Sequence, residues 1–170
     1  MTEFAIRKAD PRDATSLVDL ARAVSTEPGG WLLSEDSWRS VGEERRYLRA
    51  VRRHPDAVVL VAEAPEGIVG RLSLARDAHP ASRHVADIGL MVAASHRRRG
   101  IGVALLEAAE EWARWAQIRK LELHVFPHNE PAIRLYEKAG YVREGYRHDH
   151  YVRGGKYVDA ILMAKAIAPE

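Results

Sequence analysis

Hydrophobic residues recur along the chain with two spacings, and the order of these spacings indicates an α/β protein. Between residues 86 and 92, apolar side chains alternate with other residues, which is typical of a half-buried strand. Between residues 101 and 117 they follow the spacing of a helix with one buried face. The same patterns predict strands at 4–6, 57–64, 68–75, 86–92, 121–125, 141–151 and 156–166, and helices at 11–24, 38–53, 101–117 and 132–139.

The composition narrows the classes of protein to which the chain can belong. Its 170 residues are 46% hydrophobic and 29% charged, and we expect one domain, residues 1–170, with a substantial core. A formal net charge of only +2 argues against a dedicated nucleic-acid binder. The absence of cysteine excludes disulfides, thiolate metal sites and a cysteine nucleophile. The polar N-terminus and the lack of a long apolar run predict a cytoplasmic protein that does not enter a membrane.

The segment between the central strand and the central helix has the properties of an anion-binding site. Three arginines precede one glycine, and a second glycine lies in the first turn of the helix. The first N–H groups of a helix have no partner within it, and the helix dipole is positive at this end. Guanidinium groups beside these N–H groups favour a polyphosphate. The candidate phosphate-binding residues are Arg97, Arg98, Arg99, Gly100, Ile101, Gly102 and Val103.

Two motifs give the chain a resemblance to a known family. Arg97-x-x-Gly100-x-Gly102 matches the signature Gln/Arg-x-x-Gly-x-Gly/Ala, which follows the fourth strand of the GNAT family of N-acetyltransferases. Residues 129–141 are similar to a second segment of that family, Asn-x-x-Ala-x-x-Leu-Tyr-x-x-x-Gly-Phe/Tyr. The resemblance extends over nearly the whole chain and is weakest at residues 25–53, where the family varies its substrate-binding elements.

The resemblance implies a fold and an activity. The fold would be a single α/β domain whose central, mixed and mostly antiparallel sheet splays near its fourth strand and is flanked by about four helices. The activity would be transfer of an acetyl group from acetyl-CoA to a primary amine, by direct attack in a ternary complex and without a metal. The amine could belong to a small molecule, an amino acid or a protein N-terminus. Arginine and histidine residues near the C-terminus favour an acceptor that carries a carboxylate.

The resemblance also suggests roles for particular residues. Met91 and Val92 lie where the family's strand leaves its neighbour and offers backbone groups to pantetheine, and the N–H of Val92 would polarise the thioester carbonyl. Asn129 and Ala132 belong to the second motif, whose asparagine holds the start of the helix or donates to pantetheine. Tyr136 would donate a proton to the CoA thiolate, because a tyrosine with a pKa of about 10 is protonated at neutral pH. Taken by itself, a tyrosine on a short helix more often occupies a core position.

The incoming amine must lose a proton, because an ammonium group with a pKa of about 10.4 is not a nucleophile. Asp87 is the first candidate base, since family members often carry a glutamate near this point of the strand, and the shorter aspartate favours a bridging water. Glu35 and His124 are alternatives. Asp87 is equally compatible with an exposed carboxylate at a strand end, and catalysis can also depend on positioning of the substrates.

Other interpretations compete with this one. Residues 100–105 contain part of a dinucleotide-binding motif, but the third glycine is missing. An acetyltransferase-like module that binds acyl-CoA or RNA with little catalysis would use the arginines and tyrosines of residues 141–156 as a nucleic-acid face. The segment His148–His150, together with His124 and His128, could be read as a metal cluster, but a well-spaced third ligand is not evident and we expect no metal.

Two expectations concern surfaces of the protein. Residues 25–53 include an apolar loop, with Trp31 and Leu32, that either packs on the core or forms a wall of the substrate cleft. Trp31 and Trp115 are also candidates for an interface in a homodimer, since dimer contacts often complete the acceptor pocket in the GNAT family.

Overall fold

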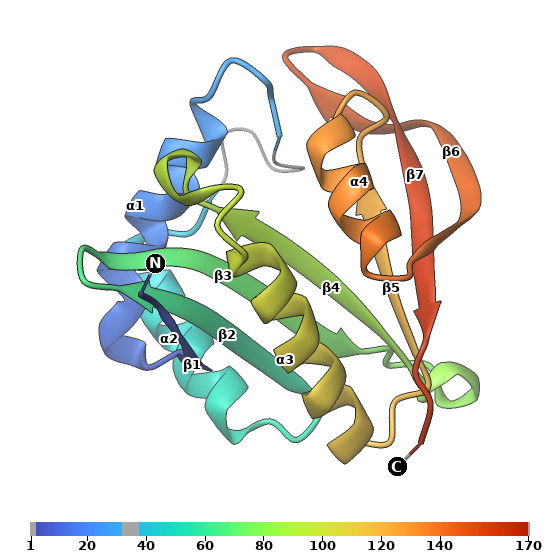
Figure 1. The fold of residues 1–170 in the computed structure, drawn as a ribbon, viewed down its shortest axis with the longest axis horizontal. Helices are drawn as coiled ribbons and strands as arrows, with labels where there is room; N and C mark the ends of the chain where they lie inside the picture. The colour runs from blue at the N-terminus through green and yellow to red at the C-terminus, as the bar shows by residue number, and fades with distance from the viewer. Residues whose placement is uncertain (1–2, 32–37, 170) are drawn as a thin grey trace.

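The computed structural model describes residues 3–31 and 38–169, so the candidate base Glu35 and the apolar Leu32 lie outside the described residues. The described chain forms a seven-stranded sheet in the order β1-β2-β3-β4-β5-β7-β6 (Figure 1). Every neighbouring pair of strands is antiparallel except β4 and β5, which are parallel. The strands are β1 (Ala5–Lys8), β2 (Ala57–Ala64), β3 (Gly67–Arg76), β4 (Val85–Val92), β5 (Lys120–Val125), β6 (Val142–Arg153) and β7 (Lys156–Ala166).

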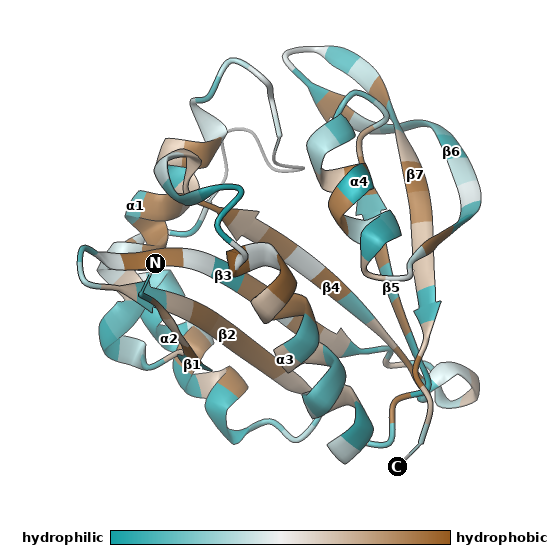
Figure 2. Cartoon of the chain, viewed as in Figure 1, coloured by the Kyte–Doolittle hydropathy of each residue, from teal (hydrophilic) through white to brown (hydrophobic). Residues whose placement is uncertain are grey.

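Helices cover both faces of this sheet. In Figure 1, α3 and α4 lie in front of the strands and α1 and α2 lie behind them, and each pair has its own cluster of buried apolar side chains. The central strands β2, β3 and β4 are largely hydrophobic along their length (Figure 2). The predicted α/β fold, with a mixed sheet and about four helices, is therefore confirmed. None of the helices in the described ranges combines the length and the apolar character that a membrane crossing requires. The helices are α1 (Ala14–Ser25), α2 (Val41–Arg53), α3 (Ile101–Trp115) and α4 (Glu130–Lys138).

The sheet opens between its two parallel strands. β4 and β5 pair only from Val85 with Lys120 to Asp87 with Glu122, although β4 continues to Val92. On its other side β5 pairs with β7 along its whole length, and β4 pairs with β3 in the same way. The predicted splay near the fourth strand is therefore present. We call the unpaired stretch beyond Asp87 and Glu122 the β4–β5 opening.

Capping side chains place the starts of two helices differently from the prediction. Ser40 Oγ accepts a hydrogen bond from the N–H of Glu43 at 3.3 Å, and the Glu43 carboxylate accepts one from the N–H of Ser40 at 2.8 Å. This capping box begins α2 after Ser40, not at residue 38. Asn129 caps α4, which therefore begins directly after it and not at residue 132.

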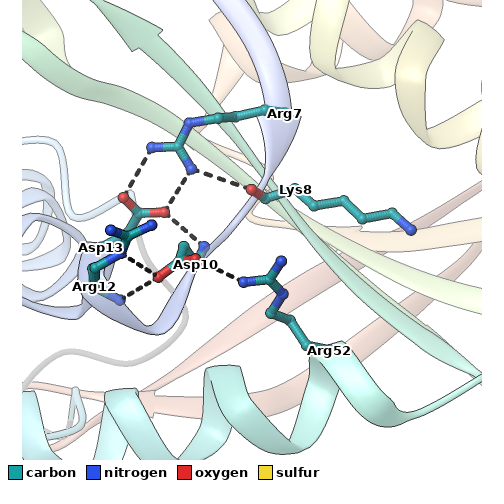
Figure 3. A pocket seen from close by; sticks show the side chains of 6 residues that line it. All are labelled: Arg7, Lys8, Asp10, Arg12, Asp13 and Arg52. Atoms are coloured by element: carbon teal, nitrogen blue, oxygen red, sulfur yellow. Dashed lines mark hydrogen bonds and ion pairs between the residues drawn. The ribbon is translucent and has the colours of Figure 1, made fainter.

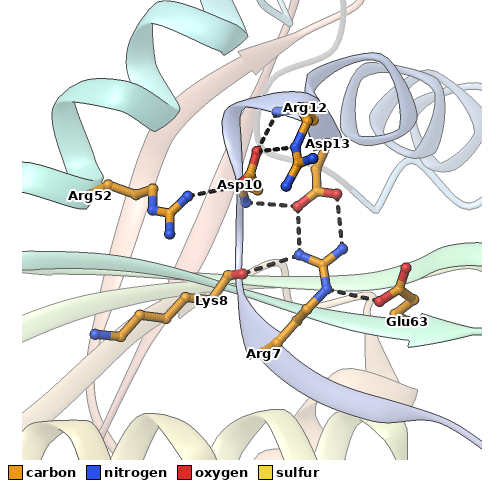
Figure 4. A network of polar contacts seen from close by, with 7 residues as sticks. All are labelled: Arg7, Lys8, Asp10, Arg12, Asp13, Arg52 and Glu63. Atoms are coloured by element: carbon orange, nitrogen blue, oxygen red, sulfur yellow. Dashed lines mark hydrogen bonds and ion pairs between the residues drawn. The ribbon is translucent and has the colours of Figure 1, made fainter.

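A network of ion pairs connects β1 with the turn before α1 and with α2 (Figure 4). Two guanidinium nitrogens of Arg7 donate to the Asp13 carboxylate at 2.8 and 2.9 Å. Asp10 accepts hydrogen bonds from Arg12 and from Arg52 of α2. These bonds, with that from the backbone N–H of Arg12 as the largest contribution, lower the pKa of Asp10 to about 2. The network therefore holds the N-terminal strand and α2 together at the edge of the sheet.

Candidate active site

The unpaired half of β4 presents backbone groups to the β4–β5 opening. The N–H of Ala93 donates to the carbonyl of Val69, on the β3 side, at 2.8 Å. Successive residues of a strand direct their backbone groups to opposite sides, so Val92 and Leu90 direct theirs away from β3 and into the opening. Met91 directs its backbone groups to β3 and packs its side chain against α1. Of the two predicted backbone sites, Val92 lies at the opening, and Leu90 takes the place expected for Met91.

The start of α3 leaves N–H groups available to an anion. Gly100 is the N-cap residue, has a φ of 84° and provides no side-chain cap, and the first turn contains no acidic residue. Arg98, with a φ of 61°, and Arg99 are exposed beside this turn. Ile101 is buried and anchors the helix in the core, whereas the side chain of Val103 is 43% exposed. Uncapped N–H groups with exposed arginines beside them fit a pyrophosphate such as that of CoA.

Gly102 has a packing role that the motif alone did not reveal. A Cβ atom added at this position would lie 2.8 Å from Cδ2 of Leu135 on α4. At Gly100, by contrast, an added Cβ would meet no atom within 4 Å, so this glycine is needed for its backbone conformation. The absence of a side chain at Gly102 therefore allows α4 to approach α3. The sequence motif instead predicts that this glycine lets a phosphate approach the backbone.

The guanidinium group of Arg97 is occupied by contacts within the protein. It donates to both carboxylate oxygens of Glu27, at 2.6 and 2.8 Å, and from Nε to the carbonyl of Val92 at 3.1 Å. Glu27 follows α1 and also accepts from the indole N–H of Trp31 at 2.9 Å. Arg97 therefore joins the loop after α1 to the end of β4, and what remains for a phosphate at this position is the backbone.

α4 presents the residues of the second motif to the same region. Asn129 Oδ1 accepts from the N–H of Ala132 at 3.3 Å, which leaves its amide nitrogen available as a donor. Tyr136 is 6% exposed, and its ring contacts the edge of the Tyr141 ring at 5.9 Å. Burial raises the pKa of Tyr136, so the hydroxyl is protonated at neutral pH. No hydrogen bond within the described residues occupies this hydroxyl, which is unlike the satisfied core tyrosine of the alternative interpretation.

Two carboxyl groups meet where β4 and β5 separate. Asp87 and Glu122 are partners in the last paired position. Asp87 is exposed at the surface, as the strand-end alternative expected, and partial desolvation, followed by the charge of Asp77, raises the pKa of its carboxyl group. Burial and then the charge of Asp87 raise the pKa of Glu122. Each of the two carboxylates is therefore a stronger base than an ordinary surface carboxylate.

Further along β5, His124 Nδ1 lies 2.7 Å from the Tyr151 hydroxyl, and burial lowers the pKa of His124.

Aromatic side chains form a wall beside these groups. Trp31 stacks on His128 at 5.9 Å between ring centroids, and His128 stacks on Phe126 at 5.3 Å. Tyr151 meets the edge of Phe126, and the guanidinium of Arg153 lies 5.5 Å from the centre of the same ring. The loop after α1 thus packs against residues that follow β5, and Trp31 also packs against the buried cluster of α1, as the core-packing alternative expected.

The histidines of β6 have separate neighbours. His148 lies against Tyr146, with 4.7 Å between ring centroids, whereas His150 lies against His124 at 5.6 Å. A register shift of β6 between residues 147 and 151 interrupts the alternation between them. In the part of the chain that the structure describes, no group of three or more His, Cys, Asp or Glu residues is placed to hold a metal ion.

A cavity of about 440 Å³ beside β1 lies apart from these groups (Figure 3). It is lined by the side chains of the ion-pair network described above, and its carboxylates are already paired with arginines. β2 and β3 separate β1 from β4 in the sheet. The cavity therefore has no part in the β4–β5 opening.

Comparison with known proteins establishes the class of protein that this fold and site define. Residues 20–141 match the model of the acetyltransferase (GNAT) family, and the chain belongs to this family. It is an N-acetyltransferase that uses acetyl-CoA as the acetyl donor, and the alternative of a binding module with little catalysis is not favoured.

Individual relatives cover almost the whole chain. The L-amino acid N-acetyltransferase AaaT of Escherichia coli (strain K12) is 31% identical over 97% of this chain and 99% of its own length. A GNAT family acetyltransferase from Streptococcus pneumoniae has a TM-score of 0.88 and 31% identity, over 98% of this chain and 100% of that one. The fold of yncA, an acetyltransferase from Salmonella typhimurium solved with acetyl-CoA, is similar with a TM-score of 0.85 and 20% identity, over 98% and 95% of the two chains.

We expect Val103→Glu to weaken acetyl-CoA binding by roughly tenfold or more, because it adds a negative charge beside the proposed phosphate site. The same acid is favourable at the start of a helix, so the melting temperature should not fall. Val103→Gln introduces a side chain of the same size as glutamate but without the charge. It is the matched control and should bind acetyl-CoA nearly as well as the wild type. Calorimetric titration measures both affinities, and equal affinity of the Glu and Gln variants would place the phosphates elsewhere.

Proposed function

We propose that the protein transfers the acetyl group of acetyl-CoA to the amino group of a carboxylate-bearing small molecule of the α-amino acid class. The observation that carries the catalytic part of this proposal is the convergence of three features on the β4–β5 opening. These are the backbone N–H of Val92, the uncapped start of α3, and the Asp87–Glu122 pair. The acceptor class is supported by the similarity to AaaT, whose name specifies L-amino acids, along nearly the whole chain.

The residues of the opening divide the chemistry between them. N–H groups from Arg98 to Val103 bind the pyrophosphate, and Leu90 and Val92 pair with the pantetheine amides as a neighbouring strand would. The N–H of Val92 donates to the thioester oxygen as negative charge develops there. Asp87, directly or through a water, accepts the proton of the ammonium group, with Glu122 as its neighbour.

Transfer then follows from the positions of these groups. The amine nitrogen forms a bond to the acetyl carbon while the carbon–sulfur bond breaks, and the electron pair of that bond goes to the sulfur. Tyr136 donates its proton to the departing thiolate, and the acetylated nitrogen then gives up its second proton, through water, to restore the Tyr136 hydroxyl. The proton held by the carboxyl pair returns to solvent, so the reaction releases one proton overall. No covalent enzyme intermediate is needed, in keeping with a chain that has no cysteine.

The acceptor is tested by measuring release of free thiol from acetyl-CoA with a panel of amines. The panel contains amino acids, their amides, spermidine and a peptide with a free N-terminus. We expect turnover with one or more amino acids and little with spermidine. Turnover with spermidine or the peptide alone would overturn the acceptor class, and no turnover with any amine would overturn the enzymatic function.

We expect Asp87→Asn to lower kcat/KM by about a hundredfold, because it removes the base that takes the amine's proton. In the wild type the rate should rise with pH through the raised pKa of Asp87, since only the ionised carboxylate accepts a proton. In Asp87→Asn this rise should disappear, and the residual rate should increase only toward the pKa of the amine itself. Glu122→Gln is the comparison: if it causes the loss and Asp87→Asn does not, the base is Glu122.

We expect Tyr136→Phe to lower kcat about tenfold or more and to leave the affinity for acetyl-CoA unchanged, because it removes only the proton donor. Tyr141→Phe is the matched control, since its hydroxyl is buried without a hydrogen-bond partner among the described residues. Steady-state kinetics and calorimetric titration of both variants make the comparison. Equal and small effects of the two substitutions would give Tyr136 a purely structural role.

We also propose a cytoplasmic homodimer. The edge strand β6 exposes Val142 and Val152, each 61% exposed, and Tyr146, which is 49% exposed. Trp115 is 73% exposed, whereas Trp31 is occupied by its contact with His128. Light scattering of the purified protein tests this assembly, and a monomer at micromolar concentration would contradict it.

A further inference from the structure

A buried cluster of charges lies on the face of the sheet that α1 and α2 cover. Arg71 of β3 is 4% exposed, and Glu44 of α2 is fully buried. Arg71 Nη2 lies 3.3 Å from one oxygen of the Glu44 carboxylate, and Arg39 Nη1 donates to the other oxygen at 3.0 Å. Counted over the described residues, the cluster therefore contains two guanidinium groups and one carboxylate, and has an excess of one positive charge.

The hydrogen-bond donors of Arg71 are not satisfied by this pairing. Within the part of the chain that the structure describes, its Nε and Nη2 atoms are buried without a hydrogen-bond partner. Arg71 lies over the rings of Trp38 and Tyr47, at 4.9 and 5.9 Å, which hold the guanidinium in place and provide no acceptor. A buried cation with unused donors is costly, and an anion that accepts from both nitrogens would remove this cost.

Arg71 is also close to the reacting groups. It is the register partner of Met91, the residue next to Val92, and the strands β3 and β4 lie about 4.8 Å apart. On the same face, Ser73 is the partner of Gly89, and the next pair in this direction contains Asp87. Gly89 is exposed, and a Cβ atom added there would lie 3.2 Å from Ser73 Oγ, so between Arg71 and the candidate base this face of β4 carries only the small side chain of Ser73 beside a glycine.

We propose that Arg71 binds the carboxylate of the acceptor and thereby selects α-amino acids over simple amines. This inference rests on the proposed function and specifies how the acceptor is recognised. A carboxylate beside Arg71 neutralises the cluster and accepts hydrogen bonds from Nε and Nη2 as a fork. With the carboxylate held on β3, the short distance between the two ends of an α-amino acid directs its amino group toward the neighbouring edge of β4.

The test compares an amino acid with its own α-amide as acceptors, in the wild type and in Arg71→Met. We expect the wild type to prefer the acid, and Arg71→Met to raise KM for the acid by roughly 10- to 100-fold. The KM for the amide should change by less than about threefold. The thermal shift produced by acetyl-CoA should stay within the scatter of repeated melting measurements. Arg71→Lys should recover part of the preference, because it retains the charge without the fork.

A second set of variants separates recognition from folding. Arg71→Met leaves Arg39 and Glu44 as a neutral pair, so we expect its melting temperature to stay near that of the wild type. Glu44→Gln leaves the buried Arg71 without its carboxylate partner and beside a second cation, Arg39, and should lower the melting temperature clearly. Arg39→Met is the matched control, because Arg39 is 37% exposed and already donates to Glu44, and it should keep the preference for the acid.

The outcomes distinguish this inference from the proposed function. Equal losses with acid and amide, or a wild type without preference for the acid, would overturn the role of Arg71 and leave acetyl transfer intact. If no amine is acetylated at all, titration of the same amino acids into the protein in the presence of CoA still tests the inference. Binding that Arg71→Met abolishes would support it, and absence of binding to the wild type would overturn it.

Discussion

The separation of β4 from β5 is the constraint on which the rest of the structure depends. A strand in the middle of a sheet normally satisfies its backbone groups on both sides, but beyond Asp87 the outer side of β4 has no partner strand. β5 pairs with β7 along its whole length and so stays in the sheet as it leaves β4. The backbone groups of Leu90 and the N–H of Val92 therefore face the opening, where a ligand with the hydrogen-bonding groups of an extended peptide could pair with them. α3 begins just after this edge, so the same opening combines strand-like pairing with an anion site.

The local signals of this arrangement could be predicted from sequence. The alternation of β4, the arginines before Gly100 and the helix-capping Asn129 are each defined by a few adjacent residues, and the structure contains the corresponding strand, uncapped helix start and cap. The pair of Arg97 with Glu27 could not be predicted, because its partners are 70 residues apart and meet only in the folded sheet. The role of Gly102 was missed for the same reason, since Leu135 belongs to another helix.

The buried charges of Arg71 and Glu44 have only a weak signal in the sequence. Arg71 stands at an inward position of an otherwise apolar strand, and Glu44 precedes Leu48 by one helical turn, within the buried stripe of α2. Charged residues are rarely buried, so the pattern of α2 indicated an outward glutamate. The burial of Arg71 and that of Glu44 are explained only by their contact with each other in the folded protein. Departures from the ordinary hydrophobic pattern are concentrated at functional sites, and here the departure lies one strand away from the β4–β5 opening.

The contacts of Glu27 connect the two halves of the site. Its carboxylate binds Arg97, which reaches the carbonyl of Val92, and it also accepts from Trp31, which stacks on His128. The loop after α1 and the loop before α3 therefore cannot move independently without losing a bidentate ion pair. In a reaction without a covalent intermediate, the rate depends on holding the amine and the thioester at the correct separation. A single carboxylate that fixes one loop relative to the other meets this requirement through the scaffold, and is separate from Asp87, Glu122 and Tyr136, the residues proposed to transfer protons.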